Sequence, residues 1–213
     1  MAAKLRLHTR FRNSAGQRVR IVLNLKGLDY EYIAIPSLTD AAYRAINPQG
    51  LMPTLEIDGR LVTQSMAIME LLEEIYPAPS IYPEDPVLGA QARAFGLVIA
   101  ADLHPVVVGR VRRYLADEMG ATEPRSDAWY HHWMDQGFAT LEAQLTRRTA
   151  SFRYCFSDEP GVAEACLVPQ LANARRDDCD LSDYPTLVAI DGACRELEPF
   201  IRAAPEAQPD FPG

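Results

Sequence analysis

The sequence lacks an excess of positive charge. It has 21 Lys and Arg residues against 29 Asp and Glu residues, which gives a formal net charge of −8. A nucleic-acid surface needs clustered basic side chains to neutralise phosphates, so we expect no nucleic-acid partner. Residues 1–7 lack the apolar run of a signal peptide, and we find no later apolar stretch that approaches a bilayer span. We therefore expect a cytoplasmic protein that binds no membrane and acts on a small molecule.

Cysteine is scarce and confined to the C-terminal third of the chain. The sequence contains no C-x-x-C pair and no His at the spacing of a zinc site. This pattern argues against a disulfide oxidoreductase and against a bound metal. Buried thiols behave as small hydrophobic groups, so we expect reduced packing residues at all four positions: Cys155, Cys166, Cys179 and Cys194.

The first 76 residues alternate between the period of a strand and the period of a helix. Asp58-Gly59 is the strongest short hairpin signal in this region. We predict strands over residues 5–9, 29–35, 54–57 and 60–63, and helices over residues 14–27, 39–46 and 65–76. This order is the thioredoxin-like α/β layout.

A proline-rich connector, Pro77 to Pro79, is followed only by helical periodicity. We predict helices over residues 87–119, 124–148, 162–175 and 184–203, and a tail over residues 205–213 with little that could pack. Pro105 lies inside the first of these helices and predicts a kink near His104. The chain is therefore predicted to form an α/β domain over residues 1–84 and an all-α domain over residues 85–213.

Two dipeptides in the α/β half favour ligand binding. Met52-Pro53 opens a strand where this layout carries a cis peptide bond, which would let an extended peptide pair with the backbone of Met52. An ordinary trans proline at a sheet edge is the alternative. Gln64-Ser65 begins a helix, where free N–H groups and the helix dipole favour a carboxylate. Taken alone, Gln64-Ser65 is better explained as a simple helix N-cap.

The sequence resembles the zeta class of the glutathione transferase superfamily, which includes maleylacetoacetate and maleylpyruvate isomerases. The resemblance covers essentially the whole chain. It rests on L-M-P-T-L, a D-G hairpin and Q-S-M-A-I at this spacing, and on F-R-N-S-A-G-Q-R-V-R-I-V-L-N-L-K-G over residues 11–27. In the second half, C-L-V-P-Q-L-A-N-A-R-R (residues 166–176), D-L-S-D-Y-P-T-L (residues 180–187) and I-A-A-D-L-H-P (residues 99–105) match the same class.

The resemblance implies glutathione as the cofactor, an acidic small-molecule substrate and a homodimer. In this family, glutathione thiolate adds to the cis double bond of a dicarboxylate, the new single bond rotates, and elimination gives the trans product. The implied catalytic residues are Arg12, Asn13 and Ser14, and the implied substrate-binding residues are Arg12, Arg110 and Arg176. The implied glutathione-binding residues are Gln49, Met52, Pro53, Gln64, Ser65 and His104.

The chain departs from the family pattern at the reacting centre. Asn13 aligns with the family's catalytic serine, Ser14 lies one place downstream, and Ala15 follows where the family has Cys or Thr. Either Asn13 or Ser14 could contact the thiolate. The stretch 106–109 is apolar where the isomerases carry polar residues, and the connection 35–39 is shorter than in most relatives.

The leading hypothesis is a glutathione-dependent cis–trans isomerase of maleylpyruvate or maleylacetoacetate in aromatic-compound catabolism. Two alternatives stay open. One is a glutathione transferase or lyase that acts on another acidic intermediate of an aromatic pathway. The other is a glutathione-binding interaction protein that has lost catalysis.

Overall fold

The computed structural model describes residues 4–212, and their contacts divide the chain into two compact units. The first unit contains the residues up to Tyr82 together with those from Cys194 onward, and the second is Pro83–Ala193. The boundary between Tyr82 and Pro83 lies close to the predicted boundary between residues 84 and 85. The predicted second domain included the last 20 residues of the chain, which group with the first unit instead.

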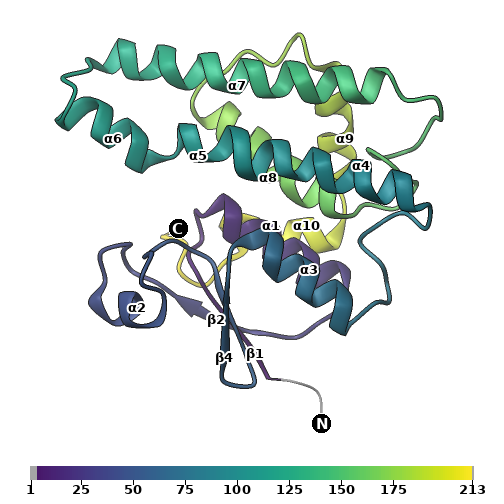
Figure 1. Cartoon of the computed structure of the whole chain (residues 1–213), viewed down its shortest axis with the longest axis horizontal. Coiled ribbons are helices and arrows are strands. Elements are labelled where there is room, and N and C mark those ends of the chain that lie inside the picture. The colour runs from purple at the N-terminus through teal and green to yellow at the C-terminus, as the bar shows by residue number, and fades with distance from the viewer. Residues whose placement is uncertain (1–3, 213) are drawn as a thin grey trace. The chain divides into compact units, whose positions relative to one another are not determined.

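The first unit is built on a four-stranded mixed sheet with the order β2-β1-β3-β4 (Figure 1). Strand β1 pairs in parallel with β2 and antiparallel with β3, and β3 pairs antiparallel with β4. The strands are β1 (Leu5–Thr9), β2 (Glu31–Ala34), β3 (Thr54–Ile57) and β4 (Arg60–Thr63). The helices between and after them are α1 (Ser14–Leu25), α2 (Ala41–Ile46) and α3 (Ser65–Ile75). The predicted thioredoxin-like α/β arrangement is confirmed.

Local turn chemistry sets several of these boundaries. Asp58 and Gly59 have φ angles of 47° and 77°, the left-handed pair that a two-residue hairpin turn requires. Gly27, just after α1, has φ 63°, as expected for a glycine that ends a helix. Helix α2 begins two residues later than predicted, because the side chain of Asp40 accepts the N–H of Tyr43 at 2.7 Å and caps the helix.

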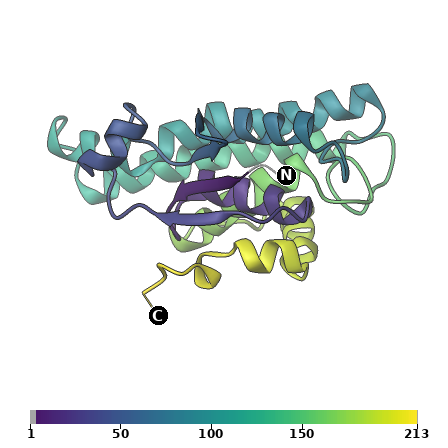
Figure 2. The ribbon, with the colours of Figure 1, turned by 90° about the horizontal axis from the view of Figure 1, so that it is seen from below.

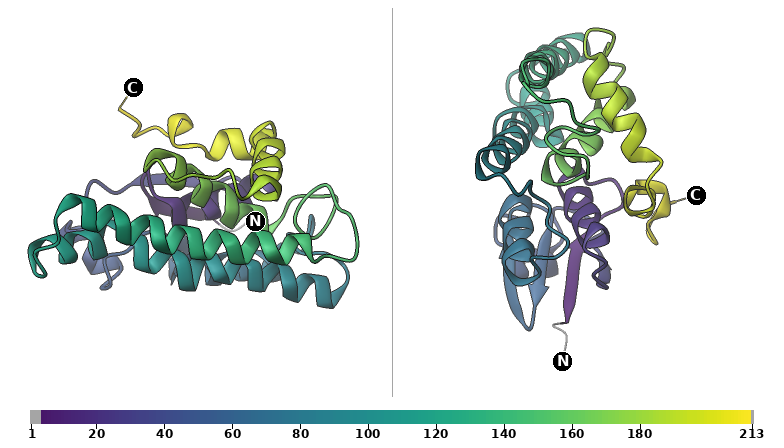
Figure 3. Two further views of the ribbon diagram at one scale, coloured as in Figure 1. Left: turned by 90° about the horizontal axis from the view of Figure 1, so that it is seen from above. Right: turned by 90° about the vertical axis from the view of Figure 1, so that its right-hand side faces the viewer.

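The C-terminal segment completes the first unit, and α10 (Glu198–Ala203) packs on α1 (Figure 3). The buried guanidinium of Arg20 donates to the carbonyl of Ala203 from Nη2 at 2.9 Å, and to the carbonyl of Phe11 at 3.1 Å. Burial lowers the pKa of Arg20. Because these donors bind backbone carbonyls, Arg20 has a structural role.

The tail beyond α10 is ordered on the first unit, so the expectation that it could pack little is wrong. After η2 (Pro205–Ala207), the carboxylate of Asp210 accepts the backbone N–H of Phe11 at 3.1 Å and the hydroxyl of Tyr32 at 2.7 Å. The ring of Phe211 packs edge-on against Phe11, with the two centroids 5.6 Å apart. These partners lie far upstream in the sequence, which is why local periodicity did not reveal them.

The second unit is helical. Its elements are α4 (Pro86–Leu97), the π-helical turn η1 (Val98–Leu103), α5 (His104–Val107), α6 (Gly109–Asp117), α7 (Glu123–Thr146), α8 (Val162–Arg176) and α9 (Pro185–Arg195). Figures 1 and 2 show α7 running beside the segment from α4 to α6. Gly137 of α7 allows a close approach to η1, since a Cβ there would lie 2.6 Å from the side chain of Leu103.

The first predicted helix is interrupted, as Pro105 indicated. The N–H of His104 bonds to the carbonyl of Ile99, five residues back, instead of four. Val108, with ψ 153°, then ends α5. The last predicted helix, 184–203, is also two helices, because Leu197 is extended between α9 and α10.

Two buried carboxylates satisfy backbone N–H groups at helix starts in the second unit. Glu142 accepts the N–H groups of Thr186 and Leu187, both at 3.0 Å, at the beginning of α9. Glu164 accepts the N–H of Gly161 at 2.7 Å at the beginning of α8. Because Gly161 has no side chain to reciprocate, only half of a capping box is present.

The segment Pro86–Asp117 is long and apolar enough to cross a membrane by length and composition. The expectation that no stretch approaches that length is therefore wrong. The segment is nevertheless not a continuous α-helix, because it contains the π-helical turn and the extended Val108. A lipid-exposed span needs an unbroken set of backbone hydrogen bonds.

Candidate active site

The strand register of the first unit gathers most of the predicted glutathione-binding residues at one end of the sheet. Thr54 of β3 lies opposite both His8 of β1 and Thr63 of β4. Pro53, one residue before Thr54, therefore lies at the same end of the sheet as Gln64, one residue after Thr63. Helix α1 also begins at this end, shortly after β1 stops at Thr9.

The start of α1 is fixed by Asn13. Its side-chain oxygen accepts the N–H of Gly16 at 2.6 Å, and its carbonyl accepts the N–H of Gln17 at 2.8 Å. Ser14 is the first residue of the helix and is half-buried. The N-terminus of a helix stabilises a nearby anion, which would include a thiolate. The structure therefore assigns Asn13 to capping and places Ser14 in the first turn.

Gln49 and Gln64 meet, although 15 residues separate them in the sequence. Nε2 of Gln64 donates to Oε1 of Gln49 at 3.0 Å, and both side chains are exposed. The backbone of Gln64 has φ 71° and ψ 116°, a conformation that L-residues rarely adopt. Strained residues of this kind cluster at ligand-binding sites.

Ser65, the first residue of α3, is buried beside Arg18 of α1. Nη1 of Arg18 lies 3.3 Å from the hydroxyl oxygen of Ser65, and Arg18 is 1% exposed. A buried guanidinium next to a helix N-terminus makes this point favourable for a carboxylate. Nothing in the sequence indicated the contact between Arg18 and Ser65, which lie 47 positions apart.

The peptide bond between Met52 and Pro53 is cis, which confirms the prediction. The loop before it is held by two donors to the carbonyl of Leu51: the side-chain amide of Asn47 at 2.7 Å and the hydroxyl of Tyr43 at 2.8 Å. Pro53 is buried and Met52 is half-buried.

The predicted arginines lie in both units. Arg12 is exposed just before α1, and its guanidinium lies 5.6 Å from the ring centroid of Phe11. In the second unit, Arg110 is exposed on α6, and His104 is half-buried at the start of α5. Arg176 ends α8, with 44% of its side chain exposed.

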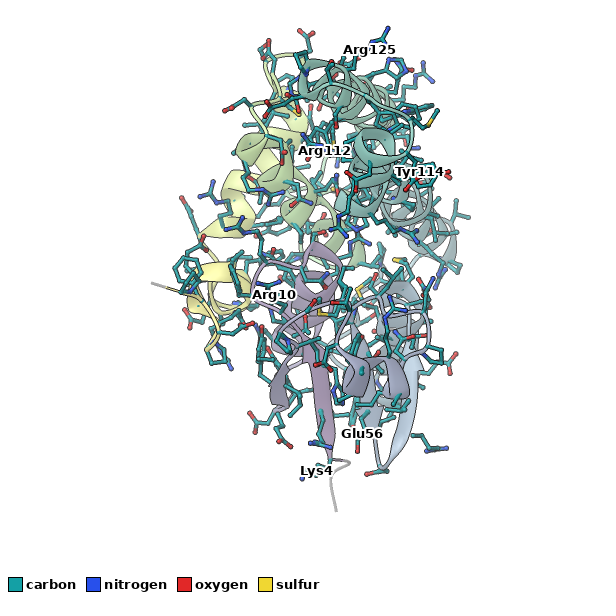
Figure 4. The ribbon with its side chains drawn as sticks, turned by 90° about the vertical axis from the view of Figure 1, so that its left-hand side faces the viewer. Lys4, Arg10, Glu56, Arg112, Tyr114 and Arg125 are labelled. Atoms are coloured by element: carbon teal, nitrogen blue, oxygen red, sulfur yellow. The ribbon has the colours of Figure 1, made fainter. Side chains whose placement is uncertain are left out.

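Arg176 belongs to a charged cluster that the sequence analysis missed. Its Nη1 donates to Oδ1 of Asn173 at 3.0 Å, and its Nη2 donates to Oδ2 of Asp177 at 3.1 Å. The other oxygen of Asp177 accepts Nη1 of Arg112, a residue of α6 labelled in Figure 4, at 2.7 Å. Arg110 and Arg112 are two positions apart, so they point to different faces of α6. Hydrogen bonds to the two oxygens of Asp177 link Arg112 with Arg176.

Cys179 lies near this cluster with a raised pKa. Burial, followed by the negative charges of Asp177 and Asp178, raises the pKa of the thiol to about 11. None of the four cysteines forms a disulfide bond, and the other three are buried. The expectation of reduced packing cysteines is therefore confirmed.

A cavity of about 410 Å³ lies elsewhere in the second unit. Its lining comes from α4, the end of α7 and the following loop, and includes Gln144, Arg147, Phe152 and Phe156. No predicted site residue lines it. Gln144 is about 25 Å along α7 from Asp127, which bonds to Arg112, at 1.5 Å per residue. The cavity is therefore separate from the arginine cluster.

Comparison with known proteins agrees with this geometry. Residues 10–80 match the family model of the glutathione S-transferase N-terminal domain. The chain is 42% identical over 211 residues to a maleylpyruvate isomerase of Ralstonia sp, which covers 97% of this chain and 99% of the relative.

Two solved structures are also similar. One is a holo maleylpyruvate isomerase described as a bacterial zeta-class glutathione S-transferase, with 41% identity and a TM-score of 0.93 over 96% of this chain and 99% of that one. The other is a maleylacetoacetate isomerase of Methylobacterium extorquens AM1 with bound malonate and glutathione. It has 34% identity and a TM-score of 0.92 over 98% of this chain and 100% of that one. Similarity at this level over nearly the full length shows that the chain belongs to the zeta class of the glutathione S-transferase family of enzymes.

Proposed function

We propose that this protein is a glutathione-dependent cis–trans isomerase of a maleyl-type dicarboxylate, maleylpyruvate or maleylacetoacetate, in aromatic-compound catabolism. The observation that carries the proposal is the meeting of the α1 N-terminus, Met52-Pro53 and Gln64-Ser65 at one end of the sheet. The relatives named above, which are isomerases of this kind, support it.

The residues at this end of the sheet offer groups that would bind the carboxylate and the peptide backbone of glutathione. The N-terminus of α3, with Ser65 and the buried Arg18, would bind a carboxylate, and the Gln49–Gln64 pair offers amide groups beside it. The backbone of Met52 would pair with the extended peptide. His104 remains the predicted contact from the second unit.

Bound glutathione supplies a thiolate that adds to the cis double bond and leaves again after rotation about the new single bond. The protein must keep that sulfur ionised. The N–H groups and dipole of the first turn of α1 lower a thiol pKa, and the hydroxyl of Ser14 can donate to the sulfur. The capping bond of Asn13 holds this turn in place.

The substrate is a dianion, so the enzyme needs cations that do not lose their charge. Guanidinium groups meet this need, because they stay protonated and match the geometry of a carboxylate. We assign this role to Arg12, Arg110 and Arg176. Their exposure to solvent leaves them accessible to a ligand.

The direct test is an ultraviolet assay of maleylpyruvate isomerisation with the purified protein and glutathione. We expect turnover that requires both components. Free glutathione at the same concentration is the control, and an enzyme rate equal to that of the control would overturn the proposal.

A second candidate is a glutathione transferase or lyase that acts on another acidic intermediate. It is favoured by Ala15 beside Ser14 and by the apolar stretch 106–108, which offer a dicarboxylate few polar contacts. A panel of acidic electrophiles would separate this activity from isomerisation. Glutathione binding without turnover on any of them would point to an interaction protein instead.

We also propose that the enzyme works as a homodimer in the cytoplasm and does not bind membranes. The support is its membership of the family and the interrupted helix over residues 86–117. Sedimentation should give a particle of twice the chain mass of 23.7 kDa. A monomer at micromolar concentration would overturn the dimer.

A further inference from the structure

The carboxylate of Asp177 joins two arginines through its two oxygens. Oδ1 accepts Nη1 of Arg112 at 2.7 Å, and Oδ2 accepts Nη2 of Arg176 at 3.1 Å. Asp177 is the less exposed member of its pair with Arg176, with 21% of its side chain exposed against 44%. Asp177 therefore links Arg112, which contacts α7, to the more exposed arginine.

Arg112 makes three contacts besides its bond to Asp177. Its Nη2 donates to Asp127 at 2.5 Å, its Nε lies 3.4 Å from the hydroxyl of Ser126, and its guanidinium carbon lies 5.1 Å from the ring centroid of Tyr130. All three partners belong to α7. Arg112 thereby anchors Asp177, at the end of α8, to the start of α7.

Arg176 has N–H donors that its bonds to Asn173 and Asp177 do not use. A guanidinium has five N–H donors, and the bonds to Asn173 and Asp177 use two of them. The remaining donors can take a carboxylate. The cluster of Arg112, Asp127, Arg176 and Asp177 is neutral overall, so a substrate anion would not meet an excess of negative charge.

We propose that Asp177, anchored by Arg112, is a positioning residue that orients Arg176 toward one carboxylate of the substrate. The inference rests on the proposed function. An exposed arginine loses rotamer freedom when it binds, and prior fixation by Asp177 reduces that loss. Nothing in this role involves the glutathione end of the site.

The experiment compares Asp177→Asn with Asp127→Asn in the full-length enzyme. Both changes remove one carboxylate from Arg112, but only Asp177 contacts Arg176. At saturating glutathione, Asp177→Asn should raise KM for maleylpyruvate about five- to twentyfold, with kcat changed less than about twofold. Asp127→Asn should change KM less than about twofold, and neither should change KM for glutathione. Asp177→Glu should recover part of the effect, since it keeps the charge.

A double-mutant cycle isolates the contact. Adding Asp177→Asn to Arg176→Ala should raise KM no further, because the residue being positioned is gone. Thermal unfolding of both Asn variants checks that a difference in stability does not explain the result. Equal KM values for the two Asn variants, or a further rise in the Arg176→Ala background, would overturn this inference alone. A wild-type protein without turnover would overturn the proposed function, and this inference with it.

Discussion

The side-chain oxygen of Asn13 accepts the backbone N–H of Gly16 at 2.6 Å, so Asn13 is the N-cap of α1. Asn13 is the residue that the family resemblance placed at the position of a catalytic serine, and its oxygen is used by the cap. Ser14 follows it as the first residue of the helix. We propose Ser14 as the residue that contacts the thiolate, because it begins the helix whose N-terminus stabilises an anion.

Replacing Ser14 and Asn13 separately should give different defects. Ser14→Ala should raise the pKa of bound glutathione and lower the isomerisation rate at pH 7 by about tenfold or more, because one donor to the sulfur is lost. Asn13→Ala should lower the free energy of unfolding by about 1 kcal/mol through loss of the cap. Thiolate absorbance against pH and denaturant unfolding measure the two effects. If only Asn13→Ala raised the thiol pKa, the assignment would be reversed.

Gly16→Ala should be strongly destabilising. A Cβ at this position would lie 2.0 Å from Oγ1 of Thr9 and 2.6 Å from Oδ1 of Asn13, so either the strand or the cap must move. We expect a loss of about 2 kcal/mol or more in the free energy of unfolding. Gly192→Ala in α9 is the matched control, because nothing lies within 4 Å of its Cβ, and it should stabilise by about 0.5 to 1 kcal/mol. Equal losses for the two variants would contradict the close approach.

Gln64→Gly should separate stability from binding. Glycine adopts φ 71° without the steric cost that glutamine bears, so the variant should gain up to about 1 kcal/mol in the free energy of unfolding. It should lose affinity for glutathione, because the pair with Gln49 disappears. Calorimetric titration with glutathione and thermal unfolding test the two halves. Gln49→Ala is the control, for which weaker binding without a stability gain is expected.

Arg176→Ala should weaken the reaction with little effect on stability. Loss of a charge-assisted bond to a substrate carboxylate predicts a reduction of about ten- to over a hundredfold in kcat/KM, on the order of 1.5 to 3 kcal/mol. Glutathione affinity should barely change, and Arg176→Lys should recover only part of the loss if the fork is used.

Replacing the neighbouring Arg175 should affect stability, whereas replacing Arg176 should affect the reaction. It pairs with the buried carboxylate of Asp191 at 2.7 Å. Arg175→Ala should therefore lower the free energy of unfolding by about 3 kcal/mol, since it removes an ion pair from a buried carboxylate. An unchanged kcat/KM in Arg176→Ala would remove Arg176 from the site.

The thiol of Cys179 should ionise only in strongly alkaline solution. Its pKa is raised from the ordinary 9.0 to about 11, first by burial and then by Asp177 and Asp178. The folded state therefore favours the neutral thiol, and this contribution to stability is complete below pH 9 and disappears as the pH rises through about 11. Alkylation by iodoacetamide, with Cys179→Ser as the control, should accelerate toward pH 11. A plateau near pH 9 would show an unshifted thiol.

Local signals predicted the parts of the fold that local chemistry determines. The Asp58-Gly59 turn and the end of α1 at Gly27 follow from residues that accept positive φ angles. The packing of residues 205–212 escaped prediction because its partners are distant in sequence: Phe11 lies 199 positions from Asp210, and Tyr32 lies 178 positions from it.

The candidate site likewise contains residues whose placement could be predicted from the sequence and residues whose contacts could not. The placement of Pro53, Gln64 and Ser65 at one end of the sheet was predictable, because the flanking strands β3 and β4 form a hairpin. Arg112 was missed, since an arginine on an amphipathic helix gives no sign of a carboxylate 65 positions away at Asp177. The one sequence signal for this cluster was Asp177 itself, an acidic residue directly after the predicted binding residue Arg176.

The contact between Phe11 and the Asp210-Phe211 tail has a consequence for biosynthesis. The ribosome releases β1 and α1 first, but the N–H of Phe11 finds its carboxylate partner only when a residue 199 positions later has been made. The second unit is contiguous, so all of it has been synthesised before that point. The unit that begins first in translation is thus the last to be completed, which exposes its unfinished surface to chaperones and proteases for the whole of synthesis.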